Sequence, residues 1–279
     1  MDPKGRHFLI TGANTGIGRV TAEVLAQRGG HVTLACRSEE KTRPALEAIS
    51  GAGGDAHFLP LDLGDLASVR RCAEAYLATG QPLHGLINNA GLAGAGGATH
   101  DGFEKTFGTN HLGHFLLTTL LLPRLRESAP ARIVNVASIA HYKAKGIDWE
   151  ALRRPQRSTT GLPEYEVSKL CNVLFTRELA RGRAGAGVTS YALHPGVIAS
   201  DVWRKVPWPV RPVIKLFMKS NEEGAKTTLH CATAPELASH DGRYYDDCQE
   251  RPPSPLADDA ALARTLWEKS EAWVQGRTP

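Results

Sequence analysis

The sequence predicts an α/β fold in which one doubly wound sheet of about seven parallel strands carries helices on both faces. Apolar runs of strand length alternate with helical patterns at even spacing along all 279 residues. A glycine-rich turn separates the first apolar run from the first helical pattern. No composition break, internal repeat or linker divides the chain, so we expect a single domain over residues 1–279.

Each element is predicted by its local pattern. The expected strands are His7–Thr11, His31–Cys36, Ala56–Leu61, Leu83–Ile87, Ala131–Ala137, Val188–Leu193 and a short run within Asp241–Tyr245. The expected helices are a segment from the glycine-rich turn to Gly29, then Lys41–Ser50, a segment from Asp65 through Leu77, Phe103–Leu125, Tyr165–Ala180, Asn221–Ala234 and Ala257–Val274. Asp65 and Asn221 are the expected N-caps of their helices.

The composition excludes several classes of function. A net charge of +4 on a chain with 42% hydrophobic and 22% charged residues gives no case for nucleic-acid binding. The five scattered cysteines form no C-x-x-C pair, which favours free thiols in a reducing compartment. No H-E-x-x-H motif occurs, so we expect no metal site. The polar start Met1–Arg6 and the short apolar run Phe115–Leu122 predict neither a signal peptide nor a transmembrane segment, and we expect a cytoplasmic protein.

The first turn has the features of a dinucleotide-binding loop. Gly12-Ala13-Asn14-Thr15-Gly16-Ile17-Gly18 lies between a strand and a helix. Glycines there leave backbone N–H groups free to approach a pyrophosphate, and the helix N-terminus adds positive dipole. We therefore expect a Rossmann-type sheet whose cofactor contacts include Gly12, Asn14, Thr15, Gly16, Ile17 and Gly18.

The end of the second strand bears on the choice of cofactor. An NAD site usually places Asp or Glu there to bond the ribose 2′-OH. This chain has Cys36 and Arg37, and a guanidinium pairs with a 2′-phosphate that a carboxylate would repel. NADP(H) is therefore expected and NAD(H) is the less favoured choice. In the alternative interpretation Arg37 is a solvated strand end, and Glu39 or Glu40 takes the ribose.

Other strand ends should lie at the same edge, because carboxyl ends of parallel strands meet there. Asp62 and Leu63 come after the third strand, where an adenine ring would lie. Asn89, Ala90 and Gly91 come after the fourth strand, and their small size lets a ligand approach. His194 ends the sixth strand and is more easily explained as structural than as catalytic. The further expected cofactor contacts at that strand end are Pro195, Gly196 and Val197.

Tyr165 and Lys169 form a candidate acid/base pair. Residues four apart on a helix share a face. Lowering a tyrosine pKa from about 10 to about 7 needs roughly 4 kcal/mol. One positive charge at about 4 Å supplies about that much at an effective dielectric near 20. We therefore expect Lys169 to lower the pKa of Tyr165, although Tyr-x-x-x-Lys also occurs by chance in surface helices.

Two further polar residues are candidates for the same site. Asn110 is an unfavourable residue inside a long helix, which suggests a buried polar role such as holding a water; the alternative is an exposed side chain. Ser138 ends the fifth strand and either caps the next segment of the chain or donates a hydrogen bond to a substrate oxygen.

A segment rich in Trp, Pro and basic residues comes after the sixth strand. We expect the chain around residues 197–220, and Trp203–Phe217 in particular, to cover the substrate. A helix on a membrane surface is the alternative. Three prolines argue against one long regular helix in either role.

These motifs together resemble the signature of the short-chain dehydrogenases/reductases. The resemblance runs from about Gly5 to Val274 and rests on Thr11-Gly12-x-x-x-Gly16-Ile17-Gly18, Asn88-Asn89-Ala90-Gly91, Asn110, Ser138 and Tyr165-x-x-x-Lys169. The chain is most similar to the retinol dehydrogenase-like branch. That likeness rests on Leu34-Ala35-Cys36-Arg37, the segment Asn110–Thr118, the long gap between Ser138 and Tyr165, Glu222-Glu223-Gly224-Ala225 and Gly242-Arg243-Tyr244-Tyr245.

The resemblance implies an oxidoreductase that transfers hydride between NADP(H) and a hydrophobic, retinoid-like aldehyde, ketone or alcohol. It implies that Tyr165 exchanges the proton and that Lys169 lowers its pKa and holds the nicotinamide ribose. Ser138 would orient the substrate oxygen, and Asn110 would carry a water that links Lys169 to solvent. A homodimer or homotetramer is also implied. The alternatives are a catalytically silent dinucleotide-binding scaffold, and a sugar epimerase or dehydratase, for which little chain remains after Gly196.

Overall fold

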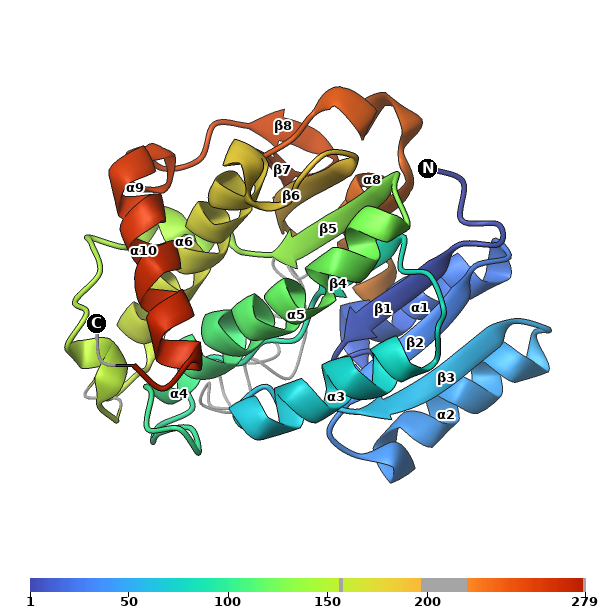
Figure 1. Cartoon of the computed structure of the whole chain (residues 1–279), viewed down its shortest axis with the longest axis horizontal. Helices are drawn as coiled ribbons and strands as arrows, with labels where there is room; N and C mark the ends of the chain where they lie inside the picture. Colours follow the sequence, from blue (N-terminus) through green and yellow to red (C-terminus); the bar gives the residue numbers. More distant parts are fainter. Residues whose placement is uncertain (156–157, 197–219, 278–279) are drawn as a thin grey trace.

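The computed structural model describes residues 1–155, 158–196 and 220–277, and in this part of the chain eight strands form one sheet (Figure 1). The strand order is β3-β2-β1-β4-β5-β6-β7-β8. The strands are β1 (His7–Thr11), β2 (His31–Cys36), β3 (Asp55–Pro60), β4 (Gly85–Asn88), β5 (Ala131–Val136), β6 (Val188–His194), β7 (Arg243–Asp246) and β8 (Gln249–Arg251). All adjacent pairs are parallel except β7 and β8. The order 3-2-1-4-5-6 is that of a Rossmann-type doubly wound sheet, which confirms the predicted fold class.

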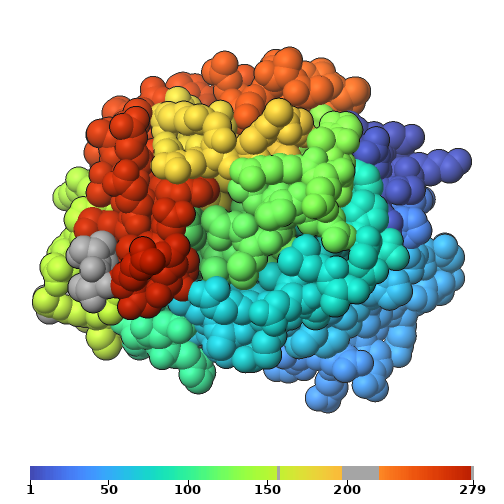
Figure 2. All heavy atoms as spheres, in the orientation of Figure 1, coloured from blue at the N-terminus to red at the C-terminus, as the bar shows by residue number. Residues whose placement is uncertain are grey.

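Helices cover both faces of the sheet. One face carries α1 (Gly16–Gln27), α2 (Glu39–Gly51) and α8 (Asn221–Thr233). The other carries α3 (Leu66–Ala78), α5 (Gly113–Glu127), α6 (Leu162–Glu178) and α10 (Ala260–Val274). Shorter pieces are α4 (Lys105–Phe107), α9 (Pro255–Asp258), 3₁₀ turns at Ile139–Lys143, Ala151–Arg153 and Pro235–Ser239, and π turns at Gly108–Leu112 and Leu179–Arg183. Figure 2 shows α10 packed over its face beside α5 and α6.

The central strands are buried on both sides, as their continuous apolar runs predict. In β1, Leu9 belongs to the core under α5 and α6, whereas Phe8 and Ile10 belong to the core under α1 and α8. Successive side chains of a strand point to opposite faces, so one strand supplies both cores. Each turn at the carboxyl edge of the sheet is therefore held by a rigid strand.

Several element boundaries differ from the prediction. β8 was not expected, because its three exposed polar residues leave no apolar pattern. The N-cap of α8 is Ser220 rather than Asn221, and Ser220 forms a capping box with Glu223. The expected helix Phe103–Leu125 contains a π turn at Gly108–Leu112 and continues past Pro123. Asp65 caps α3 as predicted, since its side chain accepts from the N–H of Ala67.

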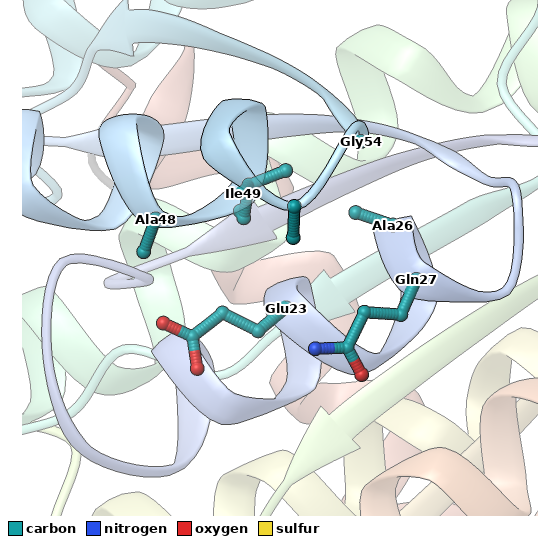
Figure 3. Close-up of a pocket in the computed structure, with 7 residues that line it drawn as sticks. Glu23, Ala26, Gln27, Ala48, Ile49 and Gly54 are labelled. Atoms are coloured by element: carbon teal, nitrogen blue, oxygen red, sulfur yellow. The ribbon is translucent and has the colours of Figure 1, made fainter.

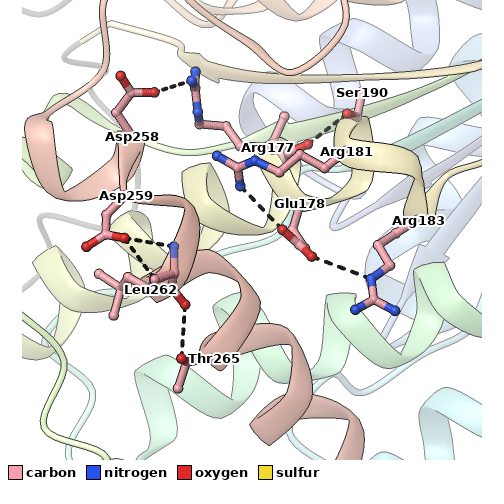
Figure 4. Close-up of polar contacts among 11 residues, drawn as sticks. Arg177, Glu178, Arg181, Arg183, Ser190, Asp258, Asp259, Leu262 and Thr265 are labelled. Atoms are coloured by element: carbon pink, nitrogen blue, oxygen red, sulfur yellow. Dashed lines mark hydrogen bonds and ion pairs between the residues drawn. The ribbon is translucent and has the colours of Figure 1, made fainter.

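Ion pairs fix the carboxyl end of α6, the helix that carries Tyr165 and Lys169. Glu178 is buried and pairs with Arg181 at 3.3 Å and with Arg183 at 3.5 Å (Figure 4). Arg177 pairs with Asp258 of α9. A carboxylate is seldom buried without such partners, and here two guanidiniums close the π turn at the end of α6. The helix is thereby tied to the C-terminal elements.

Three general findings bear on the expectations from composition. All five cysteines are free. Within the described residues, no helix has both the length and the apolar character that crossing a membrane requires. The same residues contain no group of three or more His, Cys, Asp or Glu side chains able to hold a metal ion.

Candidate active site

Tyr165 and Lys169 share one face of α6. The Lys169 Nζ atom lies over the Tyr165 ring, 5.6 Å from its centroid. Lys169 is only 3% exposed, and its Nζ donates a hydrogen bond to the carbonyl oxygen of Val136 at 2.8 Å. Val136 is the last residue of β5, so the ammonium group reaches the carboxyl edge of the sheet. The two side chains are therefore arranged as the i, i+4 spacing predicted.

The pKa of Tyr165 differs from the expectation. Burial raises the pKa of the Tyr165 hydroxyl, and a side-chain hydrogen bond with Ser138 acts in the opposite direction. In the protein without bound ligands this pKa is thus raised rather than lowered, and Lys169 is not among the groups that act on it. Desolvation also lowers the pKa of Lys169 itself to about 8. The phenol is therefore protonated at neutral pH.

Ser138 caps the next segment of the chain, which is one of the two roles expected for it, and it also contacts Tyr165. It is buried at the end of β5 and forms a side-chain hydrogen bond with Tyr165. Its Oγ also accepts from the N–H of Ala140 at 3.2 Å and so caps the 3₁₀ turn Ile139–Lys143. The cap fixes the serine hydroxyl beside the tyrosine hydroxyl.

Asn110 is fully buried within the π turn that precedes α5. Its side-chain amide donates to the Leu92 carbonyl at 2.9 Å and to Ser168 Oγ at 3.0 Å, and its Oδ1 accepts from the Leu92 N–H at 2.9 Å. The alternative of an exposed asparagine is wrong. The side chain joins the loop after β4 to α6, which places the turn directly beside Lys169.

Gly91 locates the space between these groups. A Cβ atom at Gly91 would lie 3.4 Å from Lys169 Nζ and 3.6 Å from Asn110 Oδ1. The candidate catalytic residues therefore converge beside the exposed backbone after β4. Ser138, Tyr165, Lys169 and Asn110 come from three separate segments of the chain, and the fold brings them together at one edge.

The turn after β1 fits a pyrophosphate group. Gly12 and Gly16 have φ of 66° and 60°, which glycine adopts without strain. Thr15 is the N-cap of α1, yet its side chain makes no capping hydrogen bond, and no acidic residue lies in the first turn. The first N–H groups of α1 thus have neither a side-chain cap nor a repelling carboxylate. Asn14 and Ile17 lie half-buried on the same turn.

The turns after β1 and β4 support each other. Thr11 Oγ1 accepts from the N–H groups of Asn89 at 3.0 Å and Ala90 at 2.9 Å. The Asn89 side chain donates to the Thr11 carbonyl at 2.9 Å. A Cβ atom at Gly18 would lie 2.4 Å from Asn89 Nδ2, so only glycine allows α1 to pack this closely. These bonds and the close approach of Gly18 hold the two turns against each other.

The remaining predicted cofactor contacts lie at the expected strand ends. Arg37 is exposed directly after β2. Asp62 is half-buried after β3, and its Oδ1 accepts from the Gly64 N–H at 2.9 Å, while Leu63 is buried. Pro195 and Gly196 are half-buried after β6, where His194 is buried. Val197 and the expected cover Trp203–Phe217 lie outside the described residues.

Sequence reasoning missed two buried histidines of this site. His141 is fully buried; its Nδ1 donates to the Ser138 carbonyl at 2.7 Å, and its Nε2 accepts from the Ser254 N–H at 3.1 Å. His114 lies one turn after Asn110 and bonds to its carbonyl oxygen. In the sequence, His114 stands out only as part of the segment Asn110–Thr118 that carries the family resemblance. The one signal in the sequence was that His114 comes four residues after Asn110.

A small pocket lies elsewhere on the molecule. It has a volume of about 220 Å³ and lies between α1 and α2, where Glu23, Gln27 and Ile49 are among its lining residues (Figure 3). These residues belong to the carboxyl halves of the two helices, near the amino edge of the parallel sheet. The pocket is therefore separate from the carboxyl edge, where the candidate catalytic residues converge.

The chain is similar to known proteins along nearly its whole length. A family model described as short chain dehydrogenase matches residues 6–151. Mouse retinol dehydrogenase 12 is 46% identical over 274 residues, covering 95% of this chain and 85% of that protein. Human retinol dehydrogenase 11 is 44% identical over 272 residues, again covering 95% and 85%. A crystal structure of an uncharacterised protein from Mycobacterium paratuberculosis has a TM-score of 0.79 and 34% identity, covering 99% of this chain and 96% of that one.

Proposed function

Because the chain belongs to the short-chain dehydrogenase family, in its retinol dehydrogenase-like branch, we propose that it is an NADP-dependent carbonyl reductase or alcohol dehydrogenase. The observation that carries this proposal is the convergence of Ser138, Tyr165, Lys169 and Asn110 beside Gly91. A scaffold that only binds dinucleotide has no physical need for all four. We also propose that one dinucleotide-binding and catalytic domain spans residues 1–279.

The chemistry of each residue is set by its surroundings. Tyr165 donates its proton to the carbonyl oxygen during reduction, and as tyrosinate it accepts the alcohol proton during oxidation. Ser138 orients the substrate oxygen beside that hydroxyl. Lys169 would hold the nicotinamide ribose and pass protons toward solvent. When bound, NADP(H) supplies or accepts the hydride, and the protein provides orientation and charge.

The protonated phenol has the form that a proton donor in carbonyl reduction needs. Burial raises the pKa of Tyr165, so the hydroxyl keeps its proton at neutral pH and is ready to donate it. A general base for oxidation would need the opposite shift. We therefore propose that Tyr165 acts as the proton donor in carbonyl reduction near neutral pH.

Arg37 supports the choice of NADP(H) over NAD(H). It is exposed directly after β2, where a ribose 2′-phosphate would lie, and the preceding residue is the buried Cys36 rather than an acidic residue. A guanidinium there pairs with the phosphate. Arg37→Gln should raise the KM for NADPH by about tenfold or more and leave the KM for NADH nearly unchanged. An equal change for both dinucleotides would contradict this part of the proposal.

The surroundings of the site support a hydrophobic substrate. Among the described residues, the exposed large hydrophobic side chains are Ile139, Tyr142 and Leu162. Ile139 comes directly after Ser138, and Leu162 begins the helix that carries Tyr165. All three thus flank the candidate catalytic residues in the sequence, and exposed apolar side chains that gather near a site favour an apolar ligand. We propose a hydrophobic, retinoid-like aldehyde, ketone or alcohol as the substrate class.

The decisive experiment measures NADPH consumption with a panel of hydrophobic aldehydes and ketones that includes retinal. Tyr165→Phe should bind NADPH normally and lower turnover by about 100-fold or more, because only the proton-donating hydroxyl is removed. Tyr191→Phe is the matched control. It loses a buried hydroxyl that donates to the Leu237 carbonyl at 2.6 Å on the opposite face, and turnover should not change.

Two outcomes would reject the proposal. If Tyr165→Phe kept near-normal turnover, the phenol would not be the proton donor. If the wild-type protein bound NADPH but reduced no carbonyl compound of the panel, the dinucleotide-binding scaffold would be the better description. We further propose a cytoplasmic protein that forms homodimers or homotetramers and does not act on nucleic acid.

A further inference from the structure

A chain of hydrogen bonds runs from the strand ends of the candidate dinucleotide site to the Asn110 carbonyl, and its central member is His114. The ring is buried between β1 and the π turn. Its Nδ1 lies 2.9 Å from the Asn110 carbonyl oxygen, and its Nε2 lies 2.9 Å from Thr11 Oγ1. Neither contact is explained by the catalytic roles proposed above.

The proton positions in this chain are determined by the partners. A carbonyl oxygen can only accept, so Nδ1 carries the proton and donates to Asn110. Burial lowers the pKa of His114 to about 4, so the ring is neutral at pH 7 and Nε2 must accept. Thr11 Oγ1 therefore donates to Nε2, since its other acceptor, the Ile87 carbonyl, is farther away at 3.5 Å.

All bonds of the chain point in one direction. The N–H groups of Asn89 and Ala90 donate to Thr11 Oγ1, Thr11 donates to His114, and His114 donates to the Asn110 carbonyl. Hydrogen bonds aligned in this way polarise one another and strengthen the last one. The chain begins at the turn after β4, where the predicted cofactor contacts Asn89 and Ala90 lie, and ends in the π turn.

The end of the chain lies beside the candidate proton path. Both N–H groups of the Asn110 side-chain amide are taken, by the Leu92 carbonyl and by Ser168 Oγ, and Oδ1 already accepts from the Leu92 N–H. A water can therefore be held only by an acceptor position of Asn110, which the backbone carbonyl or the second position of Oδ1 offers. A carbonyl oxygen has two acceptor positions, and His114 fills one of them. Lys169 lies close enough for its charge to lower the pKa of His114, and His111 is the other titratable group coupled to the ring.

We propose that His114 is a positioning residue that fixes the Asn110 carbonyl for proton transfer to Lys169 and couples it to the dinucleotide-binding strand ends through Thr11. The proposal rests on the proposed function only for its kinetic consequences. The Nδ1–H tautomer of His114 and its electrostatic coupling to Lys169 are properties of the protein without any ligand.

A pair of variants separates the two hydrogen bonds. In His114→Asn, the amide nitrogen occupies roughly the place of Nδ1 and keeps the bond to Asn110, but the side chain no longer reaches Thr11. In His114→Gln, the amide occupies roughly the place of Nε2, reaches Thr11 and loses the donor to Asn110. His57→Gln, a highly exposed histidine on the edge strand β3, is the surface control.

The kinetic measurement is the pH profile of kcat for carbonyl reduction. His114→Gln should lower kcat by about tenfold and shift the apparent pKa of the profile, with little change in KM. His114→Asn should recover most of kcat and keep the wild-type profile. Equal losses in both variants with an unshifted profile would mean that the ring only stabilises the fold, and the proposal would be overturned.

A second measurement needs no catalysis. ¹⁵N NMR of the free protein should show His114 as the neutral Nδ1–H tautomer at pH 7, and ¹³C NMR of labelled lysine should show the Lys169 pKa moved by about half a unit in His114→Gln but not in His114→Asn. The Nε2–H tautomer, or an unchanged Lys169 pKa in His114→Gln, would overturn the proposal. Failure of the proposed function would instead be seen as a wild-type protein that reduces no carbonyl compound while these NMR results hold.

Discussion

Lys169 should make the free protein less stable than a variant that lacks its charge. Burial lowers the pKa of Lys169 from 10.5 to about 8. At about 1.36 kcal/mol per unit, holding the ammonium charged in the fold near neutral pH costs about 3 kcal/mol. Lys169→Met removes that cost and keeps most of the side-chain volume.

The lost hydrogen bond offsets part of this gain. Lys169 Nζ donates to the Val136 carbonyl, which also accepts from Asn172 Nδ2 at 3.3 Å and so is not left without a partner. A lost bond of this kind costs about 1 kcal/mol. We therefore expect Lys169→Met to raise the free energy of unfolding by about 2 kcal/mol at pH 7, and to abolish carbonyl reduction.

The assay is urea unfolding of the ligand-free protein across pH, with Lys226→Met as a control on the exposed surface of α8. Between about pH 8 and pH 10.5, unfolded chains still bind the lysine proton whereas native ones have released it. The free energy of unfolding of the wild-type protein therefore rises with pH in that window. The difference in this free energy that favours Lys169→Met should shrink accordingly. The control should change stability by less than about 0.5 kcal/mol at any pH. A Lys169→Met variant that is less stable at pH 7, or whose advantage does not shrink with pH, would refute the reasoning.

Three further outcomes are expected from the same structure. Gly18→Ala should abolish dinucleotide binding measured by fluorescence titration, since its Cβ would lie 2.4 Å from Asn89 Nδ2; binding within about twofold of wild type would contradict the packing argument. Burial lowers the pKa of His84 to about 4, so between pH 6.5 and pH 4 unfolded chains bind the proton of this histidine and native ones do not. The free energy of unfolding should therefore fall as the pH falls through that window. In urea unfolding, His84→Gln should make this fall less steep. Cys248 has φ of 59° in the β7–β8 turn, so Cys248→Gly should raise the midpoint of thermal unfolding by relieving about 1 kcal/mol of backbone strain. A lowered midpoint would show that the lost contact of Cys248 Sγ with Thr227 Oγ1, at 3.9 Å, matters more.

The strands and helices could be predicted because their patterns are local. The apolar runs of β1 and β2 and the glycine turn between them carry their own signals of length and boundary. The π turn around Asn110 has no such signal, because its residues read as part of one long helix. Only the unfavourable asparagine indicated that the segment had another role. β8 has three exposed residues and owes its pairing to the hairpin rather than to any pattern of its own.

The positions of the candidate site residues in the fold could be predicted, but their electrostatics could not. The i, i+4 spacing correctly put Tyr165 and Lys169 on one face. It could not show that Nζ reaches over the ring to Val136, nor that both groups are desolvated. Burial therefore shifts both pKa values in the direction that favours the neutral side chain. Counting nearby charges along the sequence does not detect this effect. The role of His114 was hidden for a similar reason, since Thr11 lies far from it in the sequence.

The two outer strands of the sheet limit how copies of this protein can join. On one border, β3 exposes Asp55 and His57 and ends at Pro60, which has no N–H to offer another strand. On the other border, β8 is only three residues long, exposes all three, and is directly succeeded by Pro252 and Pro253. Neither edge strand is therefore suited to pair with a strand of a neighbouring molecule. Self-association should therefore proceed through helical surfaces, and the sheet itself should resist growing into intermolecular ribbons.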